Sequence, residues 1–327
     1  MHHPTAKIIG SAMCGNSRTF AAAMKELKIA TQRGIVLDAT LFGGHPPAGS
    51  CGAGASRSVP PHPDTVMIAI TGIHGNFYSN PFYYTVGDTL AAAGIDFIYA
   101  QTCDAFGTIH TLNAHTGAAA TIGSWNERFA DALDDVGAYV DHAQRQGYRH
   151  IVLAGHSLGA NKVIHYLSAV HDPRVEHFFL LSPANLDYMT GGVSAAERDY
   201  VRRAYAAGRA QAMLPFPLMG WVECQVGTAY DWLFGGLLNN VHTSPQGDFG
   251  QVERITHTGA LLIGTYDNFT DGDPAGFLRL INSHMPTTDH NTLLFIERTG
   301  HTYQQKHQEL ADKILTTLKH WNHENDI

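Results

Sequence analysis

The chain has 327 residues, 44% of them hydrophobic and 15% charged, and its formal net charge is −8. This apolar fraction is enough for a large core, which excludes a chain that is disordered throughout. The 21 Lys and Arg residues are outnumbered by 29 Asp and Glu residues, so no basic surface is expected to hold a phosphate backbone. We therefore expect no nucleic-acid partner.

Cysteine usage and hydropathy indicate a protein of the cytoplasm. The four cysteines are widely spaced and form no C-x-x-C pair, which is not the pattern of a disulfide framework (Cys14, Cys51, Cys103, Cys224). The first ten residues lack the basic and then apolar layout of a signal peptide. No run approaches 18 apolar residues, so we expect no membrane-spanning helix. A monomer and a homodimer both remain open.

The N-terminal part predicts two strands and then a loop. Residues 26–31 and 34–40 have the pattern of two strands joined by a short turn, which fits an antiparallel hairpin. Residues 43–64 are dominated by Gly, Pro and Ser and cannot bury enough apolar surface to order themselves. We expect a mobile surface loop there.

From residue 65 onward, short apolar runs alternate with helical patterns. The expected strands are 66–70, 95–100, 151–154, 178–181, 260–263 and 292–296. The expected helices open at Asn80–Pro81, after a capping box of Ser124 and Glu127, at residue 160, and at Tyr303. Such alternation predicts an α/β fold whose central sheet is mostly parallel and has helices on both faces.

One segment interrupts the alternation. Residues 184–256 lie between two predicted strands and are far longer than an ordinary crossover, which is typical of a functional insertion. A charged helical stretch (194–213) precedes an apolar, aromatic one, so we predict a helical cap over a core domain made of residues 1–183 and 257–327. Four of its apolar residues are candidates for lining a substrate pocket, although some of them are expected to pack the cap onto the core (Phe216, Met219, Trp221, Trp232).

The sharpest local signal is the sequence Gly-His-Ser-Leu-Gly at residues 155–159. It follows the apolar strand 151–154 and precedes a predicted helix, which is the context that a nucleophile elbow requires. A strained turn of this kind presents the hydroxyl of Ser157 at the end of the strand, and the N-terminus of the helix directs backbone N–H groups at developing negative charge. On these residues, the chain resembles an α/β-hydrolase-fold serine hydrolase over about residues 25–183 and 257–321.

The resemblance implies a Ser, acid and His triad in that chain order. The histidine of the family follows the last strand, where this sequence has Gly300–His301, so His301 is the expected base. The acid follows the preceding strand, where Gly-Thr-Tyr-Asp ends in Asp267. Asp271 and Asp273 lie in the same loop and remain alternatives for the acid.

The resemblance also implies an oxyanion hole and an activity. The backbone N–H of Leu158 would supply one donor, and Asn76, after the pair His74–Gly75, would supply the other. His74 and His156 are expected to pack beside the site. We expect a serine hydrolase that cleaves a small to medium carboxylic ester with an apolar or aromatic acyl part, feruloyl-type esters included, through an acyl-enzyme and without a cofactor.

The same residues are compatible with other functions. Amides, thioesters and lactones use the same triad, and a small-ligand receptor of this fold without turnover is the alternative of a different class. No H-E-x-x-H motif or other ligand spacing supports a metal site, and no phosphate-binding glycine motif opens a helix. The 21 histidines are therefore interpreted as composition.

Overall fold

The fold was analysed in a computed structural model that describes residues 23–43 and 63–325. Most of the loop expected at 43–64 lies outside the described residues: Gly43 ends a strand, and the chain is described again from residue 63.

Within the described residues, eight strands form the central sheet: β1 (Ala23–Ala30), β2 (Val36–Gly43), β3 (Thr65–Ile70), β4 (Asp96–Ala100), β7 (His150–Ser157), β8 (Val175–Pro183), β9 (Thr258–Gly264) and β10 (Thr292–Ile296). They lie in the order β1-β2-β4-β3-β7-β8-β9-β10. β2 pairs antiparallel with both β1 and β4, and the remaining neighbours are parallel. The expectation of a mostly parallel sheet that starts with an antiparallel hairpin is confirmed.

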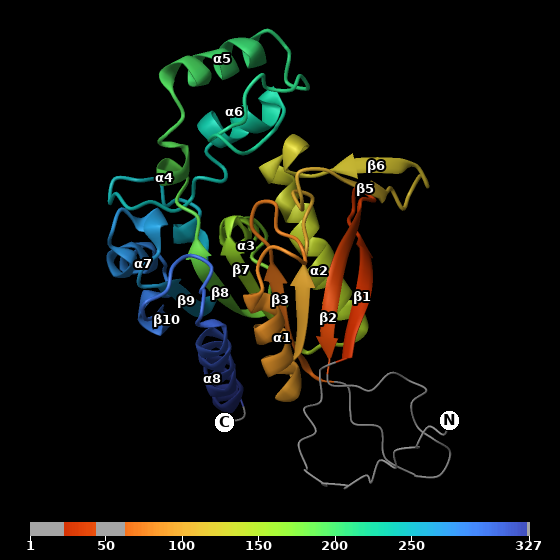
Figure 1. The fold of residues 1–327 in the computed structure, drawn as a ribbon. Helices are drawn as coiled ribbons and strands as arrows, with labels where there is room; N and C mark the ends of the chain where they lie inside the picture. Colours follow the sequence, from red (N-terminus) through yellow and green to blue (C-terminus); the bar gives the residue numbers. More distant parts are fainter. Residues whose placement is uncertain (1–22, 44–62, 326–327) are drawn as a thin grey trace, which may run out of the picture.

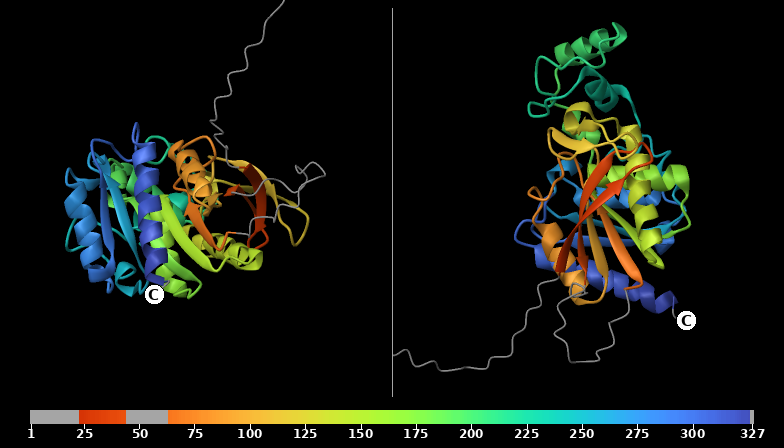
Figure 2. Two further views of the ribbon diagram at one scale, coloured as in Figure 1. Left: turned by 90° about the horizontal axis from the view of Figure 1, so that it is seen from below. Right: turned by 90° about the vertical axis from the view of Figure 1, so that its right-hand side faces the viewer.

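Helices cover both faces of the sheet (Figures 1 and 2). One face carries α2 (Ala132–Gln146), α3 (Leu158–Val170) and α7 (Pro274–Ser283), and the other carries α1 (Phe82–Ala92) and α8 (His307–Asn325). Short 3-10 turns occur at Ser124–Asn126, Phe129–Asp131, Val252–Arg254, Asn268–Thr270 and Thr288–His290. No helix among the described residues is long and apolar enough to cross a membrane.

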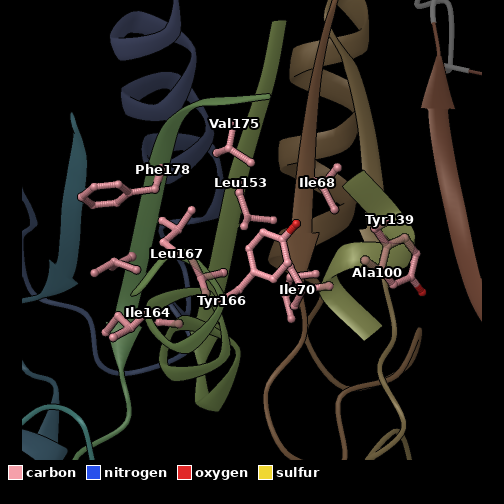
Figure 3. Packing of buried hydrophobic residues seen from close by; sticks show 14 of the residues in the cluster. Ile68, Ile70, Ala100, Tyr139, Leu153, Ile164, Tyr166, Leu167, Val175 and Phe178 are labelled. Carbon is pink, nitrogen blue, oxygen red and sulfur yellow. The ribbon is translucent and has the colours of Figure 1, made fainter. Parts of the chain in front are cut away.

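The two apolar layers explain why the central strands are continuous apolar runs in the sequence. Every residue of β3 and β4 is buried, because helices cover the sheet on both sides. Figure 3 shows one layer, in which Leu153 of β7 and Phe178 of β8 pack with Ile164 and Leu167 of α3. This rigid core fixes the carboxyl ends of the parallel strands, from which the candidate site is built.

Two predicted helix starts are wrong. Ser124 and Glu127 form no capping box: the chain makes a 3-10 turn over Ser124–Asn126, and α2 begins only at Ala132. The C-terminal helix begins at His307 and not at Tyr303, because Tyr303 and Gln305 adopt positive φ angles of 54° and 63°, which no α-helix contains. The sequence patterns also missed α7 and a separate hairpin of β5 (Ile109–Leu112) and β6 (Ala119–Ile122).

Three helices occupy the long segment between β8 and β9: α4 (Leu186–Thr190), α5 (Ala195–Ala206) and α6 (Val226–Phe234). The capping box that α5 needs is present, with Ser194 and Glu197 bonded to each other's backbone. Figure 1 shows α5 and α6 beyond the carboxyl ends of the parallel strands. Residues of this segment share an apolar cluster with Leu158, the first residue of α3.

Candidate active site

Ser157 ends β7 in a strained backbone conformation. Its φ and ψ angles are 55° and −128°, a region that residues with a Cβ rarely adopt and that costs about 1–3 kcal/mol. α3 begins at the next residue, Leu158, so the N–H groups of the first turn have no acceptor inside the helix. The side chain of Ser157 is partly exposed, whereas its neighbours in the chain are buried.

The glycines of the motif allow the chain to turn so sharply. A Cβ on Gly155 would overlap the carbonyl oxygen of Gly159, and a Cβ on Gly159 would overlap the carbonyl oxygen of Ile70 on β3. Both contacts are with backbone atoms, which cannot move aside as a flexible side chain can. The turn therefore requires glycine at both positions.

His301 and Asp267 form a hydrogen-bonded pair between two loops of the site edge. Asp267 follows β9 and His301 follows β10, and these parallel strands bring both residues to one edge of the sheet. Nδ1 of His301 lies 2.9 Å from Oδ2 of Asp267, and the ring of Phe269 packs edge-on against His301 at 4.3 Å. The carboxylate is 2% exposed, so water hardly screens the pair.

The environment of Asp267 keeps its carboxyl group ionised. Burial acts to raise the pKa of Asp267, but hydrogen bonds from His301, from the backbone N–H of Phe269 and from Ser182 outweigh it, and the pKa lies below its ordinary value. An ionised carboxylate only accepts hydrogen bonds, so Nδ1 of His301 carries the proton of this bond. Nε2 is then the nitrogen with a free lone pair.

The other two candidate acids have different partners. Oδ2 of Asp271 accepts a hydrogen bond of 2.6 Å from the hydroxyl of Thr243, and Asp273 caps α7 by accepting from the N–H of Gly276. Of the three carboxylates, the structure pairs only Asp267 with His301.

The backbone carbonyl of His301 is hydrogen-bonded to His156, within the Gly-His-Ser-Leu-Gly sequence. Its carbonyl oxygen lies 2.8 Å from Nε2 of His156, the residue before Ser157, and the centres of the two imidazole rings are 4.9 Å apart. Nε2 of His301 is buried and has no hydrogen-bond partner in the described part of the chain, so no bond yet joins it to the hydroxyl of Ser157. Such bonds are often long before substrate binds.

Asn76, the predicted second oxyanion donor, makes hydrogen bonds within its own loop. Its backbone N–H donates to Oγ of Ser79 at 3.0 Å, and its side-chain amide donates to the carbonyl of His74 at 2.7 Å. Gly72, in the same loop, lies against Ser157: a Cβ there would be 3.0 Å from Cβ of Ser157 and 3.3 Å from the nitrogen of Leu158. The residue that follows this close approach is Ile73.

A cavity of about 230 Å³ lies between the inserted segment and the loops beside the site. Its lining comprises His74, Gly107, Thr108, Trp125, Met213, Trp221 and Glu223. His74 is partly buried, which lowers its pKa and favours the neutral ring. The ring of Trp221 meets His74 edge-on at 5.3 Å.

Only Trp221 of the four predicted pocket residues lines this cavity. Trp232 is 4% exposed and its indole N–H donates to Oε2 of Glu127 at 3.0 Å, so it joins the segment to the core. Phe216 packs on Tyr200, and Met219 packs against the cluster around Leu158. A substrate-binding role for these three stays a prediction, because aromatic composition does not distinguish a packing side chain from a lining one.

Two buried residues behind Asp267 were missed by the sequence analysis. The hydroxyls of Ser182, in β8, and Tyr303 lie 2.9 Å apart, and the hydroxyl of Ser182 helps to lower the pKa of Asp267. No sequence motif marks either residue, since each acts through a neighbour that is distant in the chain. Among the residues that the structure describes, no group of three or more His, Cys, Asp or Glu side chains could hold a metal ion.

Comparisons with known proteins fit this geometry. Among solved structures, Est1E from Butyrivibrio proteoclasticus is 16% identical with a TM-score of 0.55 over 90% of this chain and 98% of its own. The structure of the same protein with bound ferulic acid is 15% identical and has a TM-score of 0.58, with the same coverage. The esterase Pf2001 from Pyrococcus furiosus is 16% identical and has a TM-score of 0.55, over 98% of this chain and 99% of its own.

These identities are low, so the likenesses establish the fold alone. No curated protein sequence matches the chain. Residues 73–313, well over half of the chain, match the sequence model of the alpha/beta hydrolase family. Together with the sheet order and the turn at Ser157, this match shows that the chain belongs to the alpha/beta hydrolase family.

Proposed function

We propose that the protein is a serine hydrolase that cleaves carboxylic esters through an acyl-enzyme. In this proposal Ser157 is the nucleophile, His301 the general base and Asp267 the residue that orients the imidazole. The bond between His301 and Asp267, at the edge of the sheet where Ser157 ends β7, is the observation that carries the proposal.

The charges of the resting site suit this chemistry. Because Asp267 is ionised and holds the proton of Nδ1, the free lone pair on Nε2 can accept the hydroxyl proton of Ser157 while Oγ attacks the acyl carbon. The imidazolium then protonates the leaving alcohol as the ester C–O bond breaks. Water next attacks the acyl group, gives a proton to His301, and the acid leaves as Oγ regains its proton. Side chains and water suffice, so the reaction needs no cofactor.

Two backbone donors are proposed for the oxyanion. Leu158 offers the first N–H of α3, where the helix dipole also favours negative charge. The second is Ile73, because a Cβ on the preceding residue, Gly72, would lie 3.0 Å from Cβ of Ser157 and 3.3 Å from the nitrogen of Leu158. In this respect we propose Ile73 in place of Asn76, whose backbone N–H donates to Ser79 and whose amide donates to His74.

An ester with an apolar or aromatic acyl group of modest size is the proposed substrate class. We propose that residues 184–256 act as a cap and that their cavity, with Trp221 and Trp125 in its lining, receives the acyl group. Apolar cavities of roughly 150 Å³ already hold benzene, so about 230 Å³ has room for one substituted ring. The ferulic acid bound to Est1E is an aromatic acid of this kind, which is why feruloyl-type esters belong in the first assay.

The test compares the wild type with Ser157→Ala on short p-nitrophenyl esters and on aryl esters, amides, thioesters and lactones. We expect ester hydrolysis to fall by a factor on the order of 10⁶, with the circular dichroism and melting temperature unchanged. A fluorophosphonate probe should label Ser157 of the wild type. An unlabelled, inactive wild type would favour a small-ligand receptor, and full activity in the alanine variant would reject the nucleophile.

A further inference from the structure

We propose that His156, the residue before the nucleophile, is a positioning residue: its Nε2–H group holds the backbone carbonyl of His301 and so keeps the general base in register with Ser157. This inference rests on the proposed function. In this inference His156 takes no part in proton transfer. Its role is to set the distance between the nucleophile, Ser157, and the base, His301.

The hydrogen bond fixes the tautomer of His156. Nε2 lies 2.8 Å from the carbonyl oxygen of His301, and a carbonyl can only accept, so Nε2 carries the proton. The other nitrogen, Nδ1, is buried and has no partner among the described residues. The bond to His301 is therefore the one polar contact that the structure gives this ring.

The surroundings of His156 keep the ring uncharged and immobile. The side chain is 2% exposed and lies among the rings of Phe82, Tyr83, Tyr303 and His301, with centre-to-centre distances of 4.9–6.4 Å. Burial, and next the nearby His301, lower its pKa to about 3, so it stays neutral wherever an esterase would work. A phenylalanine would fill the same space without an unpaired buried nitrogen, so the histidine brings a cost that only its hydrogen bond offsets.

The hydrogen bond between His156 and His301 connects the two parts of the proposed site. His156 is joined by a peptide bond to Ser157, and its bonding partner is the main-chain carbonyl of His301. Tyr303, two residues further, holds the same loop by its hydroxyl bond to Ser182. With the loop held at both points, the backbone of His301 is tied to the residue that precedes Ser157.

Two substitutions separate the hydrogen bond from the ring. His156→Phe keeps a ring and removes the donor, whereas His156→Gln restores an N–H donor the same number of bonds from Cα. His165→Phe is the matched control: His165 is likewise a buried histidine, but it lies in α3, the helix after Ser157, and bonds to Gln251. Each variant is assayed for kcat, KM and the rate of fluorophosphonate labelling, and its fold is checked by near-UV circular dichroism.

We expect His156→Phe to lose about 10- to 100-fold in kcat and labelling rate with KM nearly unchanged, since a small misplacement of a catalytic group has effects of this size. His156→Gln should recover most of the rate, and His165→Phe should match the wild type. A folded His156→Phe protein with wild-type rates, or a glutamine variant as slow as the phenylalanine variant, would overturn the inference. A wild type that does not label at all would instead refute the proposed function.

A measurement on the wild type tests the hydrogen bond between His156 and His301 even if the variants do not fold. In protein labelled with ¹⁵N-histidine, the ring of His156 should show a neutral Nε2–H tautomer that persists down to about pH 5, as its low pKa requires. An Nδ1–H tautomer, or a ring that becomes charged in that range, would overturn the inference.

Discussion

Nδ1 of His301 donates to Oδ2 of Asp267 across 2.9 Å, although β10 and helix α7 separate the two residues in the chain. The pairing of the parallel strands β9 and β10 brings the two loops together. The bond fixes both the orientation of the imidazole and the nitrogen that is left basic. It therefore predicts which of three neighbouring carboxylates the reaction needs.

Asp267→Asn is expected to lower kcat by about 10⁴-fold, because an asparagine can present its N–H groups to Nδ1 and force the wrong tautomer. Asp271→Asn is the control and should change kcat less than about threefold, since its carboxylate bonds to Thr243. Steady-state kinetics on one p-nitrophenyl ester measures both. A crippled Asp271→Asn enzyme beside an active Asp267→Asn enzyme would move the acid to residue 271.

The proposed oxyanion donor can be removed without changing a side chain. Replacing Ile73 by its α-hydroxy acid analogue turns the peptide N–H into an ester oxygen. We expect kcat to fall by about 10²–10³-fold, the usual effect of losing one oxyanion donor. Asn76→Ala should cost less than about tenfold, because the donors of Asn76 serve its own loop. The reverse order of effects would restore Asn76 to the oxyanion hole.

The features that could be predicted from the sequence are those set by local pattern and by burial on two sides. β10 begins and ends where its apolar run does, at Thr292 and Ile296, and the turn at Ser157 is visible because only glycine fits beside it. The oxyanion role of Asn76 stays a prediction that rests on the pair His74–Gly75, whereas β3 ends at Ile70 and a Cβ on Gly72 would lie 3.0 Å from Cβ of Ser157.

The features that escaped prediction depend on contacts between distant residues. Glu127 has the spacing of a helix cap, but its carboxylate is bonded to Trp232 of α6 and lies near Lys162 of α3. A local pattern cannot anticipate such partners, because a buried carboxylate gains more from a donor or a cation than from a helix start. The hydrogen-bonded pair of Ser182 and Tyr303 could not be predicted for the same reason, since the two residues are distant in the chain.

Gly159→Ala is expected to destabilise the protein by about 3 kcal/mol or more, because the added Cβ would overlap the carbonyl oxygen of Ile70 in the middle of the sheet. Gly137→Ala is the matched control. Gly137 lies inside α2, and a Cβ there would be 3.6 Å from Tyr166, which is ordinary contact, so alanine should stabilise by about 0.5–1 kcal/mol. Urea unfolding measures both variants. Equal stabilities would show that the turn at Ser157 can shift to accommodate a Cβ at position 159.

The last prediction concerns a buried charge cluster between the nucleophile helix and the inserted segment. Nζ of Lys162 lies 2.6 Å from Oδ1 of Asp104 and 3.8 Å from Oε1 of Glu127, and all three side chains are at most 4% exposed. From α6, Trp232 donates to the carboxylate of Glu127 and Thr228 donates to its backbone carbonyl. Two carboxyl groups thus share one ammonium group away from water.

Burial, and next the neighbouring Asp104, raise the pKa of Glu127 from 4.5 to about 8, and Lys162 offsets this only in part. The folded protein therefore holds a proton that the unfolded chain releases near pH 4.5, so stability falls as the pH rises from about 4.5 to about 8. Glu127→Gln keeps an uncharged side chain of the same shape at every pH. Its melting temperature minus that of the wild type should increase from pH 5 to pH 9, because the titration of groups distant from Glu127 cancels in the difference. A difference that stays constant over this range would mean that Glu127 is already ionised at pH 5.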